Sequence, residues 1–63
     1  MENILKKCRE EQGMTQDELA KKSGVARTTI SFLETQKKID VKLSTLSALA
    51  KSVGKEVSEV FLI

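Results

Sequence analysis

The stretch that decides the fold covers residues 15–35 and reads TQDELAKKSGVARTTISFLET. Thr15 and Glu18 have the spacing of a capping box, in which each side chain hydrogen-bonds the other's backbone N–H at the start of a helix. Gly24 predicts the end of that helix, because glycine readily adopts the left-handed conformation that closes a helix. A second helix follows at about residues 27–35. Two short helices joined by a tight turn containing glycine form a helix-turn-helix unit.

Apolar residues at helical spacing continue on both sides of this unit, which spans about residues 16–35. Either Ser44 or an earlier residue is expected to cap the helix that follows it. No segment alternates between apolar and polar residues over five or more positions, so strands are not expected. The predicted fold class is all-α, with five short helices in a single domain over residues 1–63. The predicted helices span about residues 2–12, 15–23, 27–35 and 44–53, with a last one after Gly54.

Each predicted helix carries a face that can enter a common core. The fourth shows the clearest pattern, with apolar residues at i, i+3, i+4 and i+7. The predicted core residues are Ile4, Leu5, Cys8, Leu19, Ala20, Val25, Ile30, Leu33, Leu46, Leu49, Ala50, Val53, Val57, Val60 and Phe61.

Composition excludes several classes of function. The chain has 63 residues, of which 40% are apolar and 32% charged, as expected for one small globular domain. It has no histidine and a single cysteine, Cys8, and therefore offers no Cys/His zinc site, no internal disulfide and no histidine base. Cys8 is expected to fill the core. We therefore expect no enzyme, no cofactor and no small-molecule ligand.

Targeting signals are also not expected. The longest apolar run, residues 60–63, is far shorter than a membrane span, which needs about 20 residues. The first residues, MENI, do not combine a basic segment with an apolar one, so no secretory signal is predicted. A lone cysteine suits a reducing compartment. The expected location is the cytoplasm, with no membrane partner.

Positive charge gathers in the middle third of the chain. Residues 21–42 hold six basic side chains and two acidic ones, a balance of +4, whereas the whole chain carries +2. This asymmetry indicates an anionic partner. A solvated lysine-rich surface is the alternative interpretation.

A longer pattern of residues runs through nearly the whole chain. Its members are Arg9, Gly13, Met14, Thr15, Gln16, Leu19, Ala20, Gly24, Val25, Ile30, Ser31, Leu33 and Glu34, then Leu43, Leu46, Leu49, Ala50, Lys51, Val53, Gly54, Val60 and Phe61. This pattern resembles the lambda-repressor-like (Xre-type) helix-turn-helix family. The resemblance implies a domain that binds double-stranded DNA and places the second helix of the motif in the major groove.

Helical geometry and the resemblance together nominate the residues that read bases. Ile30 and Leu33 define the core side of the third helix, and Thr28, Phe32 and Thr35 point away from it. In the family, the end of this helix that carries Arg27 enters the groove. The predicted base-reading residues are Arg27, Thr28, Ser31 and Phe32. Two alternatives remain: Phe32 folds into the core, or Arg27 is a solvated arginine.

Other residues are predicted to hold the DNA backbone or to brace the motif. The phosphate contacts are assigned to Thr15, Gln16, Thr35, Lys37 and Lys38. Capping for Thr15 and a solvated loop for the two lysines are the competing interpretations. The resemblance further implies a structural ion pair between Arg9 and Glu34, which orients the third helix.

Two positions depart from the family pattern. Ala26 stands where the family often has a Ser or Thr that caps the third helix. Thr35 and Gln36 stand where the family commonly has Asn-Gly. The path of residues 35–40 is therefore open.

The C-terminal segment, about residues 55–63, is predicted to form a homodimer. Its short helix packs on the core, and Leu62 and Ile63 are left apolar at the end of the chain. We assign the dimer interface to Val60, Leu62 and Ile63; folding of the last two residues onto their own core is the alternative. The predicted function is a bacterial or phage repressor that binds an inverted-repeat operator. The alternative is a protein-interaction module, such as an antitoxin that binds a partner protein and regulates its own gene.

Overall fold

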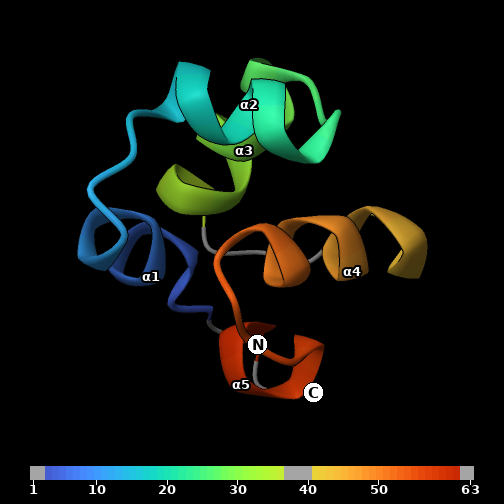
Figure 1. Ribbon diagram of the computed structural model, residues 1–63. Helices are drawn as coiled ribbons and strands as arrows, with labels where there is room; N and C mark the ends of the chain where they lie inside the picture. Colours follow the sequence, from blue (N-terminus) through green and yellow to red (C-terminus); the bar gives the residue numbers. More distant parts are fainter. Residues whose placement is uncertain (1–2, 37–40, 62–63) are drawn as a thin grey trace.

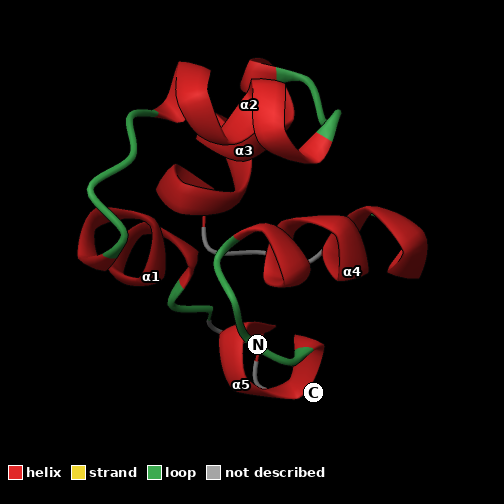
Figure 2. Ribbon diagram, viewed as in Figure 1, coloured by secondary structure: helices red, strands yellow, loops and turns green. Residues whose placement is uncertain are grey.

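Five helices follow one another in the computed structural model, which describes residues 3–36 and 41–61 (Figure 1). They are α1 (Leu5–Glu11), α2 (Gln16–Ser23), α3 (Arg27–Gln36), α4 (Leu43–Ser52) and α5 (Val57–Phe61). The described part of the chain contains no strand (Figure 2). The fold is therefore all-α, as predicted. None of its described helices is long and apolar enough to cross a membrane.

The start and end of α2 follow the sequence prediction. The Thr15 hydroxyl oxygen accepts a hydrogen bond from the Glu18 backbone N–H at 3.1 Å, and the Glu18 carboxylate accepts one from the Thr15 N–H at 2.8 Å. This is the complete capping box. The helix ends at Gly24, whose φ of 77° lies in the left-handed region that only glycine adopts easily. These two features fix the length of α2 and the direction of the turn into α3.

The start of α1 differs from the prediction, and the start of α4 decides between the two alternatives that the sequence left open. α1 begins at Leu5 rather than near residue 2, because the Ile4 backbone N–H bonds the Val60 carbonyl at 2.8 Å and the Asn3 side chain caps Leu5. Ile4 stays 36% exposed, so the prediction that it enters the core was wrong. α4 begins at Leu43 after Lys42, which makes no side-chain cap. A cap at Ser44 is therefore excluded.

The core lies where the five helices meet. α2 packs on α3 and α4, α4 packs on α5, and α1 packs on both α3 and α5. In Figure 1, α2 and α3 form one end of the molecule, α5 forms the other, and α1 and α4 lie between them. The buried core residues are Leu5, Cys8, Leu19, Ile30, Leu33, Leu46, Leu49, Ala50, Val53, Val60 and Phe61. Three more predicted core residues, Ala20, Val25 and Val57, are partly buried and pack against this core. Met14 and Val41, which the sequence analysis did not place in the core, pack against it as well.

One dimer assignment is wrong in the light of this packing. The Val60 side chain is 0% exposed and its carbonyl oxygen accepts the hydrogen bond from Ile4. Helix α5 turns Val60 and Phe61 inward to fill the space between α1 and α4, so Val60 cannot face a second subunit. Leu62 and Ile63 lie outside the described residues.

Candidate nucleic-acid interface

Helix α3 has one buried face and one exposed face. Ile30 and Leu33 are 0% exposed and pack in the core. The helical period of about 100° per residue turns the intervening positions outward. On that side Arg27, Thr28, Phe32 and Thr35 are exposed and Ser31 is partly exposed. The structure thus brings the four predicted base-reading residues and Thr35 to one accessible side of α3, with Arg27 at its first position.

Phe32 is the large apolar residue on this face. Its side chain is 41% exposed and takes no part in the buried core. The alternative in which Phe32 folds inward is therefore excluded. An exposed phenyl ring costs free energy in water, and a partner surface with apolar groups removes that cost.

Arg27 has an anionic neighbour on α2. Its guanidinium Nε lies 3.1 Å from a carboxylate oxygen of Asp17. Both side chains are mostly exposed, at 62% and 71% respectively. The sequence analysis did not anticipate this contact, because it depends on how the turn at Gly24 brings the starts of α2 and α3 together.

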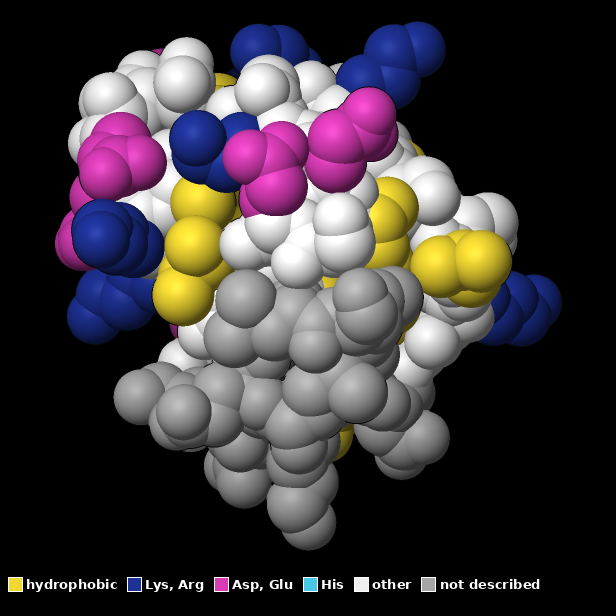
Figure 3. All heavy atoms as spheres, turned by 90° about the horizontal axis from the view of Figure 1, so that it is seen from below, with side chains coloured by type: hydrophobic (Ala, Val, Ile, Leu, Met, Phe, Trp, Pro, Cys, Tyr) yellow, Lys and Arg dark blue, Asp and Glu magenta, His cyan; other side chains and the backbone are white. Residues whose placement is uncertain are grey.

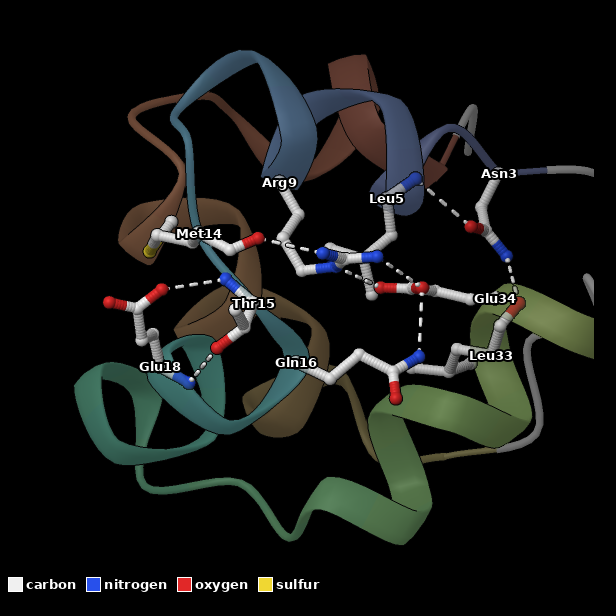
Figure 4. Close-up of polar contacts among 9 residues, drawn as sticks. All are labelled: Asn3, Leu5, Arg9, Met14, Thr15, Gln16, Glu18, Leu33 and Glu34. Carbon is white, nitrogen blue, oxygen red and sulfur yellow. Dashed lines mark hydrogen bonds and ion pairs between the residues drawn. The ribbon is translucent and has the colours of Figure 1, made fainter.

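A buried ion pair joins α1 to the end of α3 (Figure 4). Arg9 donates from Nε to Glu34 Oε2 at 2.8 Å and from Nη2 to Oε1 at 3.0 Å. Its third donor, Nη1, bonds the Met14 carbonyl at 2.7 Å. The two side chains are only 10% and 4% exposed. This planar, two-bond arrangement fixes both position and angle, which a single contact would not do.

Gln16 belongs to the same network. Its amide Nε2 donates to Glu34 Oε1 at 3.0 Å, so one carboxylate oxygen serves both Arg9 and Gln16 (Figure 4). The pattern of the sequence paired Arg9 with Glu34 but did not include this third member. The contact ties the first residue of α2 to the last turns of α3, and it sets the direction of the Gln16 side chain.

The N-terminus of α2 retains donors for an anion. The Thr15 N–H is taken up by Glu18, but the Thr15 hydroxyl only accepts in the capping box and keeps its own proton to donate. The first N–H groups of a helix have no partner within it. Capping and phosphate binding by Thr15 are thus compatible.

Asn3 provides a second tie to α3 that sequence reasoning missed. Its amide nitrogen donates to the Leu33 carbonyl at 3.1 Å, and its oxygen accepts from the Leu5 N–H at 3.1 Å (Figure 4). Asn3 is 8% exposed. One side chain therefore starts α1 and satisfies a carbonyl near the end of α3. An asparagine just before an apolar helix was the available signal.

The environment of Glu34 favours its ionised form. Burial alone would raise the pKa of this carboxyl group, but the hydrogen bonds from Arg9 and Gln16 and the charges of Arg9 and Lys6 outweigh it. The pKa of Glu34 is therefore held below its ordinary value. The hydrogen bond to Glu34, against the opposing effect of burial, raises the pKa of Arg9.

Two predicted phosphate contacts cannot be placed on this surface. Lys37 and Lys38 lie outside the described residues, as does most of the 35–40 loop. Ala26 precedes α3, and its carbonyl accepts from the Thr29 N–H at 3.0 Å, as the backbone at a helix start does. No group of His, Cys, Asp and Glu in the described ranges could hold a metal ion.

Comparison with known proteins assigns the chain to a family. The model of a helix-turn-helix family, HTH_3, matches residues 5–60. The chain belongs to this lambda-repressor-like (Xre-type) helix-turn-helix family, whose fold is a DNA-binding one.

Three archaeal relatives cover almost the whole chain. One, from Methanocaldococcus jannaschii, is 39% identical and covers 98% of this chain and 92% of its own length. The relative from Archaeoglobus fulgidus is 37% identical, with coverages of 98% and 87%. That from Methanothermobacter thermautotrophicus is 33% identical, with coverages of 100% and 91%. Each is described as an uncharacterised HTH-type transcriptional regulator. No solved structure matches the chain significantly. The predicted bacterial or phage origin gains no support from these relatives.

The Arg9–Glu34 pair predicts a specific acid sensitivity. Folding lowers the pKa of Glu34, so the ionised carboxylate stabilises the folded protein. This contribution to the free energy of unfolding is complete above the pKa of the unfolded chain, about 4.3, and is lost as the pH falls from there through the lower pKa of the folded protein. Glu34→Gln leaves the buried Arg9 charge without its partner and should cost about 3 kcal/mol at pH 7. The same variant should lose less further stability between pH 5 and pH 3 than the wild type does.

Urea unfolding at several pH values measures this difference. Glu11→Gln is the matched control, since Glu11 is exposed at the end of α1. Its unfolding free energy should follow that of the wild type. Parallel pH profiles for Glu34→Gln and the wild type would contradict the assignment.

Phe32 and Phe61 give a second, paired prediction. Phe32→Ala should change the free energy of unfolding by less than about 1 kcal/mol, because the ring is outside the core. Phe61→Ala should cost about 3–5 kcal/mol, because Phe61 is fully buried. Thermal unfolding of the two variants makes the comparison. A collapse of the melting temperature in Phe32→Ala would show that the ring is structural.

Proposed function

We propose that this protein is a transcription regulator that binds duplex DNA by placing the exposed face of α3 in the major groove. The observation that carries the proposal is the division of α3 into a fully buried face and an accessible one that holds Arg27, Thr28, Ser31 and Phe32. Arginine reads guanine, hydroxyls accept or donate to base edges, and a phenyl ring packs on thymine methyl groups. The family and the described relatives support the same function.

The start of α2 is proposed to grip the phosphate backbone. The Thr15 hydroxyl, the Gln16 side chain and the first free N–H groups of α2 form this part of the interface. Gln16 Nε2 donates a hydrogen bond to Glu34 Oε1 at 3.0 Å. This bond ties the proposed contact with the DNA backbone to α3. Thr35 lies on the exposed side of α3, and Lys37 and Lys38 follow it in the sequence and are proposed to add phosphate contacts.

The regulator is proposed to be a repressor that binds an inverted repeat as a homodimer. With Val60 buried, the surface that suits a second copy lies where α4 meets α5. Two adjoining hollows there share Ser47, Glu56 and Val57, and Leu43 beside them is 63% exposed. In the view from the α5 side, hydrophobic side chains reach the surface at separate places, on one side close to charged side chains (Figure 3).

The charges around these hollows favour a copy of the same chain over another partner. Lys51, Lys55, Glu56 and Glu59 line one of them, two positive and two negative side chains. A two-fold interface brings a patch against itself, so a patch that carries both signs can pair with its own copy. The interface is completed in this proposal by Leu62 and Ile63, which follow α5 directly in the sequence.

DNA binding is tested with a library of random-sequence duplexes. The protein should select an inverted repeat, and its affinity should fall by roughly three to five decades between 50 and 200 mM salt if the dimer contacts about six to ten phosphates. Arg27→Ala should reduce the preference for the selected site, since each good base contact contributes about 1–3 kcal/mol of discrimination.

Lys22→Ala is the matched control for Arg27→Ala, because it removes one exposed positive charge at the far end of α2. It should keep the ratio of specific to non-specific binding. Salt-independent binding, or no binding to any duplex, would contradict the proposed function and favour a module that binds a partner protein instead.

The dimer is tested at Leu43. Leu43→Asp places a charge in the proposed interface, while an acidic residue at the first position of α4 favours the helix itself. Sedimentation at micromolar concentration should show twice the 7.0 kDa chain mass for the wild type and the single mass for the variant. Phe32→Ala, exposed on α3, should remain dimeric. A monomeric wild type would end this part of the proposal.

A further inference from the structure

Asp17 stands on the same side of the helix-turn-helix as Arg27, although a carboxylate is a poor neighbour for DNA. We infer that Asp17 is a positioning and specificity-determining residue, which holds the guanidinium of Arg27 so that its terminal amino groups face a guanine. This inference rests on the proposed DNA-binding function and adds a residue to it that touches Arg27 rather than a base.

The geometry of the contact leaves the reading edge of Arg27 free. Asp17 is the second residue of α2 and Arg27 is the first of α3. The contact runs from Nε of Arg27 to Oδ1 of Asp17 at 3.1 Å. Nε is not one of the two terminal nitrogens, Nη1 and Nη2, so the contact that Nε makes leaves both terminal amino groups available. Those two groups are the ones that bond guanine O6 and N7 end-on.

Helix dipoles explain why Arg27 needs such a partner. The N-terminus of a helix carries partial positive charge, which disfavours a guanidinium at the first position of α3. The same effect at the start of α2 favours the carboxylate of Asp17. The ion pair therefore draws Arg27 towards α2 and limits the directions that its long side chain takes.

Binding to DNA should strengthen this contact. In the free protein both groups are mostly exposed, and an exposed ion pair contributes little. Displacement of water in the major groove lowers the local dielectric and makes the same contact stronger. An oriented Arg27 also loses less freedom on binding a base than an unrestrained one.

The charge of Asp17 acts in the opposite direction on affinity for DNA of any sequence. A carboxylate near the duplex repels phosphates and opposes the release of counterions. Asp17 should therefore lower non-specific binding and raise the preference for guanine. A residue that merely competed with DNA for Arg27 would lower both.

The experiment uses the full chain and duplexes that differ at one base pair. Selection from random duplexes with the wild type and with Arg27→Ala identifies the position whose guanine preference depends on Arg27. Four duplexes then carry each base pair at that position. The wild type should prefer guanine by about tenfold or more. Asp17→Ala should lose most of this preference and should bind random duplexes more tightly than the wild type does.

Three further variants separate positioning from charge and from folding. Asp17→Asn keeps the size of the side chain and an oxygen beside Nε but removes the negative charge, so it should retain more of the guanine preference than Asp17→Ala. In the background of Arg27→Ala, Asp17→Ala should leave the base preference unchanged. Glu11→Gln, which removes an exposed carboxylate from α1, should leave the preference at this position as it is in the wild type. Thermal unfolding confirms that each variant is folded.

An unchanged guanine preference in Asp17→Ala would overturn the inference. An increased preference would also overturn it, because Asp17 would then be competing with DNA for Arg27. If Arg27→Ala alters no base preference, Asp17 has nothing to position and the inference also falls, while binding to duplexes still supports the proposed function. Failure of the wild type to bind any duplex would instead refute the function itself.

Discussion

A guanidinium and a carboxylate meet almost out of water where α1 reaches the end of α3. Arg9 and Glu34 share two hydrogen bonds, and the pair extends to Met14 on one side and Gln16 on the other. A buried ion pair of this kind adds little net stability compared with apolar residues of the same size, but losing one partner is costly. Its effect is geometric: it fixes α1, the start of α2 and the last turns of α3 against one another.

One face of α3 contributes to the stability of the fold, and the opposite face is available for binding. Ile30 and Leu33 face the core, and substitutions there act on folding. Arg27 and Phe32 face outward, and substitutions there act on whatever binds. The helix is held from behind by apolar packing and at its end by Glu34, so the outward residues are free to vary in sequence without moving the helix that carries them.

Periodicity predicted the helices well because the spacing of apolar residues and the capping box act locally. Thr15 and Gly24 define α2 from within a few residues of its ends, and the structure agrees. Ile4 was wrongly placed in the core, since its position depends on a hydrogen bond to Val60 from the other end of the chain. The contacts of Gln16 with Glu34 and of Asp17 with Arg27 also escaped prediction, because they join residues that only the turn between α2 and α3 brings together.

The backbone hydrogen bond from the Ile4 N–H to the Val60 carbonyl joins the start of α1 to α5, two segments far apart in the sequence. Because the carbonyl of Val60 holds the residue before α1, a chain that lacks α5 should leave the start of α1 without this anchor. Such a chain should also expose the apolar sides of α1 and α4 that α5 covers, and exposed apolar surface favours association with other chains.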